Sequence, residues 1–386
     1  MATITENIQT LRSIKSDIKN AIIQKGGSVT DAFGTYAQAI TNLPSGGGGG
    51  TEIEDALVTR TLSGTYYNNR VSVAGSYAFA NNWMLSSINL PNCKQINAYA
   101  FAFCNSLLSI SLPNASIVEG YTFNNCRALP SIDLPLCTRL GYNAFQLCSV
   151  LSTVNLPLCS NVSSSAFQEC PVLTTVNLPL CTNIEWYVFR SCYSLSSIDL
   201  PSCTRLGYNV FESCSALTTV NLPLCSTISG YAFSGCTALV SINISNCTYI
   251  GDYAFYNCSN LPSIDLPLCT RLGGYGVFNK CSALLSINIP NCISIGYYVF
   301  YNCTNLKEVY LNSVSSVTTI YSETFSNCPN LTSVYVPASL VDAFKTAQYW
   351  SSISDKIVQY REIATQPDDF EHGGGDLGGG DNIEIN

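Results

Sequence analysis

The sequence predicts a repeat solenoid, an elongated fold in which similar coils stack on one another and one parallel β-sheet forms a face. Phenylalanine recurs every 22 residues at positions 79, 101, 123, 145, 167, 189, 211, 233 and 255, and again at 278, 300 and 325. Leu-Pro pairs keep the same step at 90–91, 112–113, 134–135 and onward. One such coil cannot bury its own apolar side, so it must stack on its neighbours. The spacing predicts about twelve coils.

Each coil is predicted to contain a tight turn and a short strand. Residues 145–151 place Phe, Cys and Leu at intervals of three, which predicts a helical or 3₁₀ turn. Residues 153–156, Thr-Val-Asn-Leu, alternate polar and apolar side chains, which is the period of a β-strand. Pro157 has no N–H to donate to a sheet, so the strand ends there. Neighbouring strands are expected to pair in parallel about 4.8 Å apart.

The repeat also carries a recognisable motif. LTTVNLPLC at 173–181, followed by YVFRSCYSL at 187–195, resembles the leucine-rich repeat of the BspA, or Treponema pallidum, type. The resemblance covers residues 57 to 336. It implies a right-handed α/β solenoid of the leucine-rich-repeat type, used as a surface binding scaffold without catalytic activity.

Six segments are predicted along the chain. Residues 1–44 form a short helical hairpin, 45–55 a Gly-rich linker, and 56–75 a strand-turn-strand cap. Residues 76–336 form the solenoid, and 337–363 carry a helical pattern that closes its far end. Residues 364–386 are an acidic, Gly-rich tail.

The hairpin is too small to have a substantial core of its own, so its apolar stripes need a partner. These stripes are expected to anchor the protein in an assembly, and they consist of Ile8, Leu11, Ile18, Ile22, Phe33, Tyr36 and Ile40. Residues 18–40, which read I-K-x-A-I-x-x-K-G and then F-x-x-Y-x-x-x-I, resemble the leader of phage virion and tail-associated proteins. The resemblance implies that the hairpin binds other virion proteins.

The twenty cysteines fall in two columns, one three residues after Phe and the other two residues after Pro. Stacked side chains at the strand spacing have Cβ atoms too far apart for easy disulfides, and the spacing does not fit a zinc site. Ala115 replaces one cysteine, which suits a packing position. We therefore expect reduced, buried thiols and no metal. Asn82 opens the first column, where the end coil is expected to leave it incompletely buried.

Composition excludes several classes of function. The net charge of −8 argues against nucleic-acid binding, and no apolar run is long enough for membrane insertion. The first residues lack the regions of a signal peptide, so classical export is not expected. The single histidine, His372, lies in the Gly-rich tail, which excludes catalysis that requires a positioned imidazole. We expect no enzyme activity and no cofactor.

The outward residues of the strands form the candidate ligand-binding surface. One column is Ser or Thr, and the other is Asn or Asp. The columns comprise Ser131, Asp133, Thr153, Asn155, Thr175, Asn177, Ser197, Asp199, Thr219, Asn221, Ser241, Asn243, Ser263 and Asp265. The alternative is that these columns bind no ligand and form only a polar face in contact with solvent. The Asp residues recur three coils apart, which favours duplication of a 66-residue unit over a catalytic pair.

Two functions compete at this point. The main prediction is a phage virion protein, assembled in the host cytoplasm, whose solenoid binds a host surface glycan or protein. The alternative is a BspA-like adhesin or interaction scaffold on a bacterial cell surface. Assembly as a homo-oligomer stays open in both.

Overall fold

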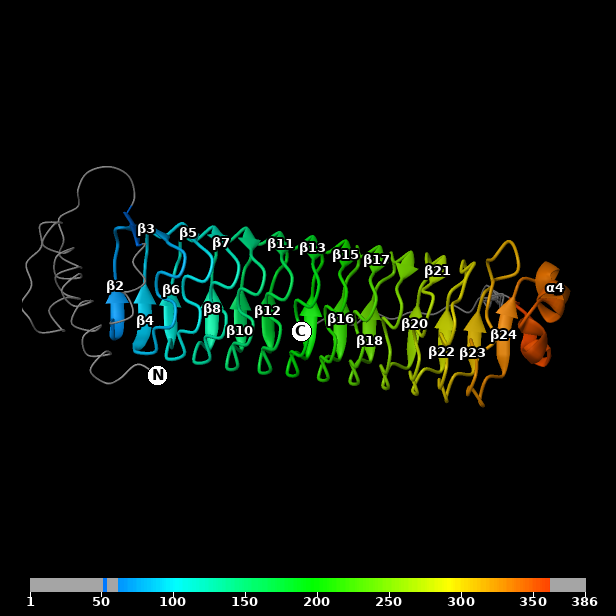
Figure 1. Ribbon diagram of the computed structural model, residues 1–386. Helices are drawn as coiled ribbons and strands as arrows, with labels where there is room; N and C mark the ends of the chain where they lie inside the picture. Colours follow the sequence, from blue (N-terminus) through cyan, green and yellow to red (C-terminus); the bar gives the residue numbers. More distant parts are fainter. Residues whose placement is uncertain (1–50, 54–61, 362–386) are drawn as a thin grey trace, which may run out of the picture.

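The computed structural model describes residues 51–53 and 62–361, which form one elongated β-solenoid (Figure 1). The predicted hairpin stripes of residues 1–44 and the predicted tail of residues 364–386 lie outside the described residues. In the described part, the coils stack along the rod, and each coil has three sides. The prediction of a repeat solenoid with parallel strands is confirmed.

The main strands form the first side, which we call the strand face. They pair in parallel at equivalent positions of neighbouring coils, for example Thr153 with Thr175. The main strands are β2 (Gly64–Tyr67), β4 (Leu85–Asn89), β6 (Ser109–Ser111), β8 (Ser131–Asp133), β10 (Thr153–Asn155), β12 (Thr175–Asn177), β14 (Ser197–Asp199), β16 (Thr219–Asn221), β18 (Ser241–Asn243), β20 (Ser263–Asp265), β22 (Ser286–Asn288), β23 (Glu308–Tyr310), β24 (Ser333–Val336) and β25 (Ile357–Gln359).

A second parallel ladder forms another side and was not predicted. It is an 11-stranded sheet, built mostly from two-residue strands that follow the Leu-Pro turn of each coil. Its strands are β1 (Thr51–Ile53), β3 (Val71–Ala74), β5 (Gln95–Ile96), β7 (Ile117–Val118), β9 (Arg139–Leu140), β11 (Asn161–Val162), β13 (Asn183–Ile184), β15 (Arg205–Leu206), β17 (Thr227–Ile228), β19 (Tyr249–Ile250) and β21 (Arg271–Leu272). Strands this short have too few residues to show an alternating pattern in the sequence.

The third side, which we call the turn side, contains successive turns, so the prediction of a helical or 3₁₀ turn is wrong. In one coil, Asn143 and Leu147 have left-handed backbone conformations, with φ of 54° and 63°. Their N–H groups donate to the carbonyls of Ser164 and Gln168 in the next coil, both at 3.0 Å. The interval of three arises because turns such as Asn143 to Gln146 close with a bond of 3.2 Å between residues three apart.

The core is a set of columns that run along the rod. The phenylalanine column stacks ring on ring: Phe145 and Phe167 have centroids 5.4 Å apart and planes within 6°. The strand leucines and the inward valines and isoleucines pack around it. The 22-residue period in the sequence is therefore the packing period of the core.

All twenty cysteines are unpaired and buried, which confirms the prediction that they pack as apolar residues. In the column after Phe, the thiol donates to a carbonyl of the preceding coil, as Cys148 does to Phe123 at 3.2 Å. In the column after Pro, it donates within its own coil, as Cys203 does to the carbonyl of Arg205 at 3.3 Å. Burial raises the pKa of the Cys148 and Cys192 thiols to about 12.

We expect alkylation of the native protein near pH 8 to be slow, because the thiols are buried and carry little thiolate. After denaturation without a reductant, mass spectrometry should find all 20 cysteines modified. Pairs of cysteines that stay unmodified until a reductant is added would contradict the unpaired columns.

The expectation for Asn82 is wrong, because its side chain is fully buried. Its amide nitrogen donates to the Leu62 carbonyl at 3.1 Å, and its amide oxygen accepts from the N–H groups of Met84 and Leu85 at 3.0 Å. The first Phe of the repeat is Phe79, and the Cys104 thiol of the next coil donates to its carbonyl. The Asn82 carboxamide thus holds the place of a thiol of the first column and satisfies three backbone groups there.

Regular structure closes both ends of the described rod. Strand β1, at residues 51–53, lies inside the predicted linker of residues 45–55 but pairs with β3. Strands β2 and β3 lie in the predicted cap of residues 56–75, and they pair with β4 and β5 as a coil of the solenoid. At the far end, η1 (Ala338–Leu340), α4 (Val341–Thr346) and η2 (Trp350–Lys356) cover the last coils. Phe344 and Trp350 are buried there, as a closing cap requires.

Candidate functional site

The strand face presents the predicted columns outward. In β8 the side chains of Ser131 and Asp133 are exposed and Ile132 is buried between them. The same alternation repeats from coil to coil, so the structure brings all fourteen candidate residues of β8 to β20 together on one surface, each exposed or half-buried. The period of two placed these side chains correctly.

The Asn and Asp column is joined by side-chain hydrogen bonds. Asn155 donates its amide nitrogen to Asp133 at 2.8 Å, and Asn177 donates to Asn155 at 2.7 Å. The next block repeats the pattern, where Asn221 donates to Asp199 and Asn243 donates to Asn221, each at 2.8 Å. Each amide thus points toward the preceding coil, and the column forms an ordered polar ladder.

The ladder and the main sheet are both interrupted three times, and the last sheet then runs through five strands without a break. The pairing of main strands stops between β6 and β8, between β12 and β14, and between β18 and β20. Each new block begins with Asp133, Asp199 or Asp265, whose carboxylate has no N–H to donate to the coil before it. The predicted 66-residue unit therefore has a physical boundary on the strand face, while the second ladder runs on without a break.

The inward side chain is less well covered at each interruption. Ile110, Val176 and Ile242, the central residues of the strands that end a block, are half-buried. Their counterparts elsewhere in these blocks, such as Val154 and Val220, are buried. The strand face is thus three three-strand blocks and a final five-strand block, separated by slightly open seams.

The face changes character near its C-terminal end, and this change was not predicted from the repeat pattern. In β23 and β24 the outward pattern becomes Glu308, Tyr310 and Tyr335, and the two phenol rings stack with centroids 4.7 Å apart. Both hydroxyls donate to the Glu308 carboxylate, at 2.8 Å from Tyr310 and 3.3 Å from Tyr335. Burial and the hydrogen bond to the Glu308 carboxylate raise the pKa of Tyr310 to about 12. Glu-Val-Tyr at 308–310 and Ser-Val-Tyr at 333–335 depart from the repeat, and this departure could have predicted the change in the face.

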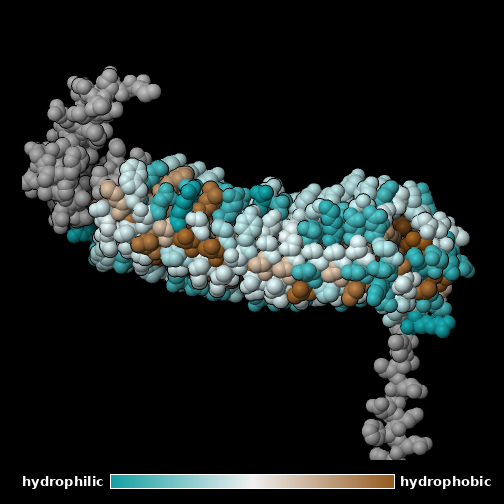
Figure 2. All heavy atoms as spheres, turned by 90° about the horizontal axis from the view of Figure 1, so that it is seen from below, coloured by the Kyte–Doolittle hydropathy of each residue, from teal (hydrophilic) through white to brown (hydrophobic). Residues whose placement is uncertain are grey.

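Exposed apolar side chains lie beside the main strands, both in the turns that follow them, such as Leu136 and Leu158, and in the loops that lead into them. Leu108, Val150 and Val172 are exposed in these loops. Viewed from below, hydrophobic residues gather over the N-terminal part of the rod among mostly polar ones (Figure 2). The strand face is therefore polar, and the exposed apolar side chains lie in the segments that border it.

The described residues contain no group of three or more His, Cys, Asp or Glu side chains that could hold a metal ion. His372 lies outside them. In the same part of the chain, no helix is both long and apolar enough to cross a membrane.

A family model for the BspA type leucine rich repeat region matches residues 72–194, 116–240, 182–291 and 226–354. Together these matches span most of the sequence. The chain belongs to this family. The matched range begins at residue 72 and does not include the leader, so the family match does not bear on the resemblance to phage proteins. No curated protein sequence matches the chain.

Several solved structures are similar to this solenoid. A leucine-rich repeat protein from Bacteroides ovatus is 20% identical, with a TM-score of 0.46 over 76% of this chain and 88% of that chain. The pneumococcal vaccine antigen PcpA is 17% identical, with a TM-score of 0.44 over 80% of this chain and 92% of that chain. The T. pallidum leucine-rich repeat protein is 22% identical, with a TM-score of 0.27 over 51% of this chain and 78% of that chain.

Proposed function

We propose that the protein is a non-enzymatic interaction scaffold of a bacterial cell surface, whose strand face binds a host protein or glycan across several coils. The observation that carries this proposal is the polar strand face, presented by a chain of the BspA-type family. Weak polar contacts gain useful affinity when many of them act together along one rigid surface. The virion role predicted from residues 18–40 has no support from the family match.

The contact is expected to centre on β10 to β16, where the predicted surface includes Thr153, Asn155, Thr175, Asn177, Asp199 and Asn221. Ser, Asn and Tyr side chains are typical of adaptable binding surfaces. The ladder holds the amide groups in fixed orientations, which lowers the entropy cost of binding.

The test is the double substitution Asn155→Lys with Asn177→Lys in the full chain. We expect attachment of the purified protein to host cells to fall by about tenfold or more, which corresponds to about 1.4 kcal/mol. Two bulky charges replace two fixed amides in the middle of the contact. Quantitative flow cytometry with the labelled protein measures the effect.

The matched control is Asn161→Lys with Asn183→Lys, because these residues are paired in the same way on the second ladder. The control should keep its attachment. Equal attachment by both correctly folded double variants, compared by thermal unfolding, would remove the strand face from the proposal.

A further inference from the structure

Two aromatic side chains form an exposed corner on a different part of the rod from the strand face. Trp186 follows β13 and Tyr208 follows β15, so they lie one coil apart where the second ladder meets the turn side. They are 56% and 51% exposed. Their ring centroids are 6.2 Å apart and their planes cross at 85°. The indole and the phenol thus form two perpendicular walls that are open to solvent.

Small residues in the neighbouring coils keep this corner open. The equivalent positions are Ser164 in the preceding coil and Gly230 in the following one. The rings also lie close to glycine backbone: a Cβ at Gly207 would be 2.8 Å from Cδ1 of Trp186, and one at Gly230 would be 3.3 Å from Cε1 of Tyr208. The corner is therefore one coil wide and held in place by its neighbours.

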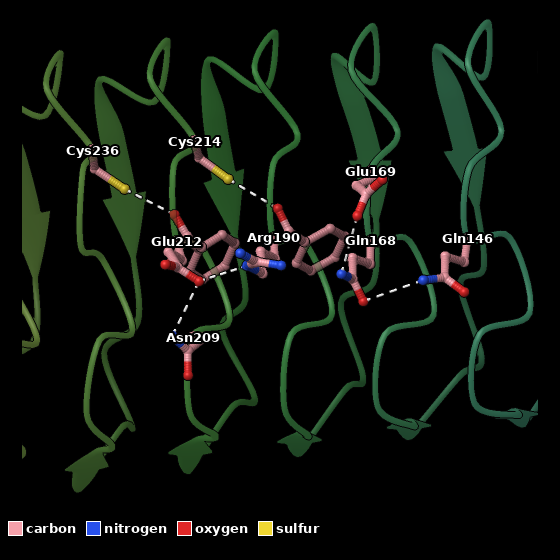
Figure 3. Close-up of polar contacts among 10 residues, drawn as sticks. Gln146, Gln168, Glu169, Arg190, Asn209, Glu212, Cys214 and Cys236 are labelled. Atoms are coloured by element: carbon pink, nitrogen blue, oxygen red, sulfur yellow. Dashed lines mark hydrogen bonds and ion pairs between the residues drawn. The ribbon is translucent and has the colours of Figure 1, made fainter.

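A fixed polar network on the turn side follows the corner along the chain (Figure 3). Arg190 comes four residues after Trp186, and Asn209 directly follows Tyr208. The Arg190 Nε lies 2.6 Å from a Glu212 carboxylate oxygen, and Asn209 donates its amide nitrogen to the same oxygen at 3.1 Å. The Arg190 guanidinium also lies 5.9 Å from the centre of the Tyr187 ring. Both charged side chains of the pair are partly exposed, and their charges cancel.

We propose that this corner is a glycan-binding site for a neutral pyranose. A pyranose ring has an apolar C–H face, which suits an aromatic wall, and a rim of hydroxyls, which suits paired donors and acceptors. Arg190 and Asn209, which follow Trp186 and Tyr208 closely in the chain, supply donors, and Glu212 supplies acceptors. Because Arg190 is paired with Glu212, this network carries no net charge, which suits a neutral sugar better than an acidic one.

A protein contact is the competing occupant, because Trp, Tyr and Arg are enriched in protein hot spots. Such hot spots lie inside a wider surface that excludes water around them. Here the pair is bordered by Ser164 and Gly230, and the polar residues Arg190 and Asn209 follow it closely in the chain. The narrow width and the polar surroundings favour a sugar ring.

The full chain is tested against an array of neutral oligosaccharides of glucose, galactose, mannose and their N-acetyl derivatives, and hits are titrated by calorimetry. We expect at least one of these probes to bind. Trp186→Ser, which introduces the residue found in the preceding coil, and Tyr208→Ser should each weaken that binding by about tenfold or more. The control is Tyr193→Ser, which removes a tyrosine that is 51% exposed and should leave binding unchanged.

Three results would overturn the glycan site. These are no binding to any neutral probe, binding that Trp186→Ser leaves intact, or a protein partner that is lost with Trp186→Ser while no sugar binds. The Asn155→Lys, Asn177→Lys variant should keep its sugar binding. The failure of the glycan site can therefore be distinguished from the failure of the proposed strand-face function.

Discussion

Replacing Phe189 by alanine should lower the free energy of unfolding by about 3–5 kcal/mol. The Phe189 ring is fully buried and lies between Phe167 and Phe211, at centroid distances of 5.5 and 5.4 Å. Removing it leaves a cavity in the middle of a stack whose two neighbours are fixed by their own coils. The rod cannot close this cavity without disturbing hydrogen bonds such as the 2.9 Å bond from the Phe189 N–H to the Val210 carbonyl.

Denaturant unfolding, followed by circular dichroism, measures this change. Each coil contacts only its neighbours, so the weakened coil should also broaden or split the transition. Tyr193→Ala, an exposed change in the same coil, should stay within about 0.5 kcal/mol of the parent protein. A loss below about 1 kcal/mol for Phe189→Ala would show that the phenylalanine column is not the stabilising core.

The fold could be predicted from the sequence because its period is the period of its packing. Phe145 and Cys148 recur at fixed steps since each occupies the same buried place in every coil. The turn side could not be predicted, because Leu147 adopts a left-handed conformation that its residue type disfavours. That conformation is stabilised by the hydrogen bond to Gln168 of the next coil, and such a contact is visible only after the coils are stacked.

The candidate binding surfaces, too, could be predicted from the sequence only in part. The outward columns followed from the alternation of residues such as Thr153 and Val154, which needs no knowledge of neighbouring coils. The seams before Asp133, Asp199 and Asp265 depend on the direction in which each amide donates. The corner of Trp186 and Tyr208 depends on the glycines beside it. The spacing of residues along the sequence shows neither the direction in which the amides donate nor the contact of the rings with the glycines.

The second large effect is expected at the C-terminal cap, where Trp350→Ala should cost about 3–5 kcal/mol of local stability. Trp350 is buried, its ring packs against Phe325 and Phe344 at 5.8 and 5.1 Å, and its Nε1–H donates to the Thr318 carbonyl at 2.7 Å. Truncation removes this packing and leaves a buried carbonyl without its donor. Because the cap covers the apolar end of the rod, its loss should open the last coils first.

Hydrogen exchange measured by mass spectrometry locates this opening. Protection in β24 and β25 should fall by about two to four orders of magnitude, while protection in β10 to β16 stays close to that of the parent protein. The matched control is Trp186→Ala, because this tryptophan is exposed and its removal leaves no buried cavity. If protection fell equally along the whole rod, the coils would unfold as one unit, and the nearest-neighbour account of this solenoid would be wrong.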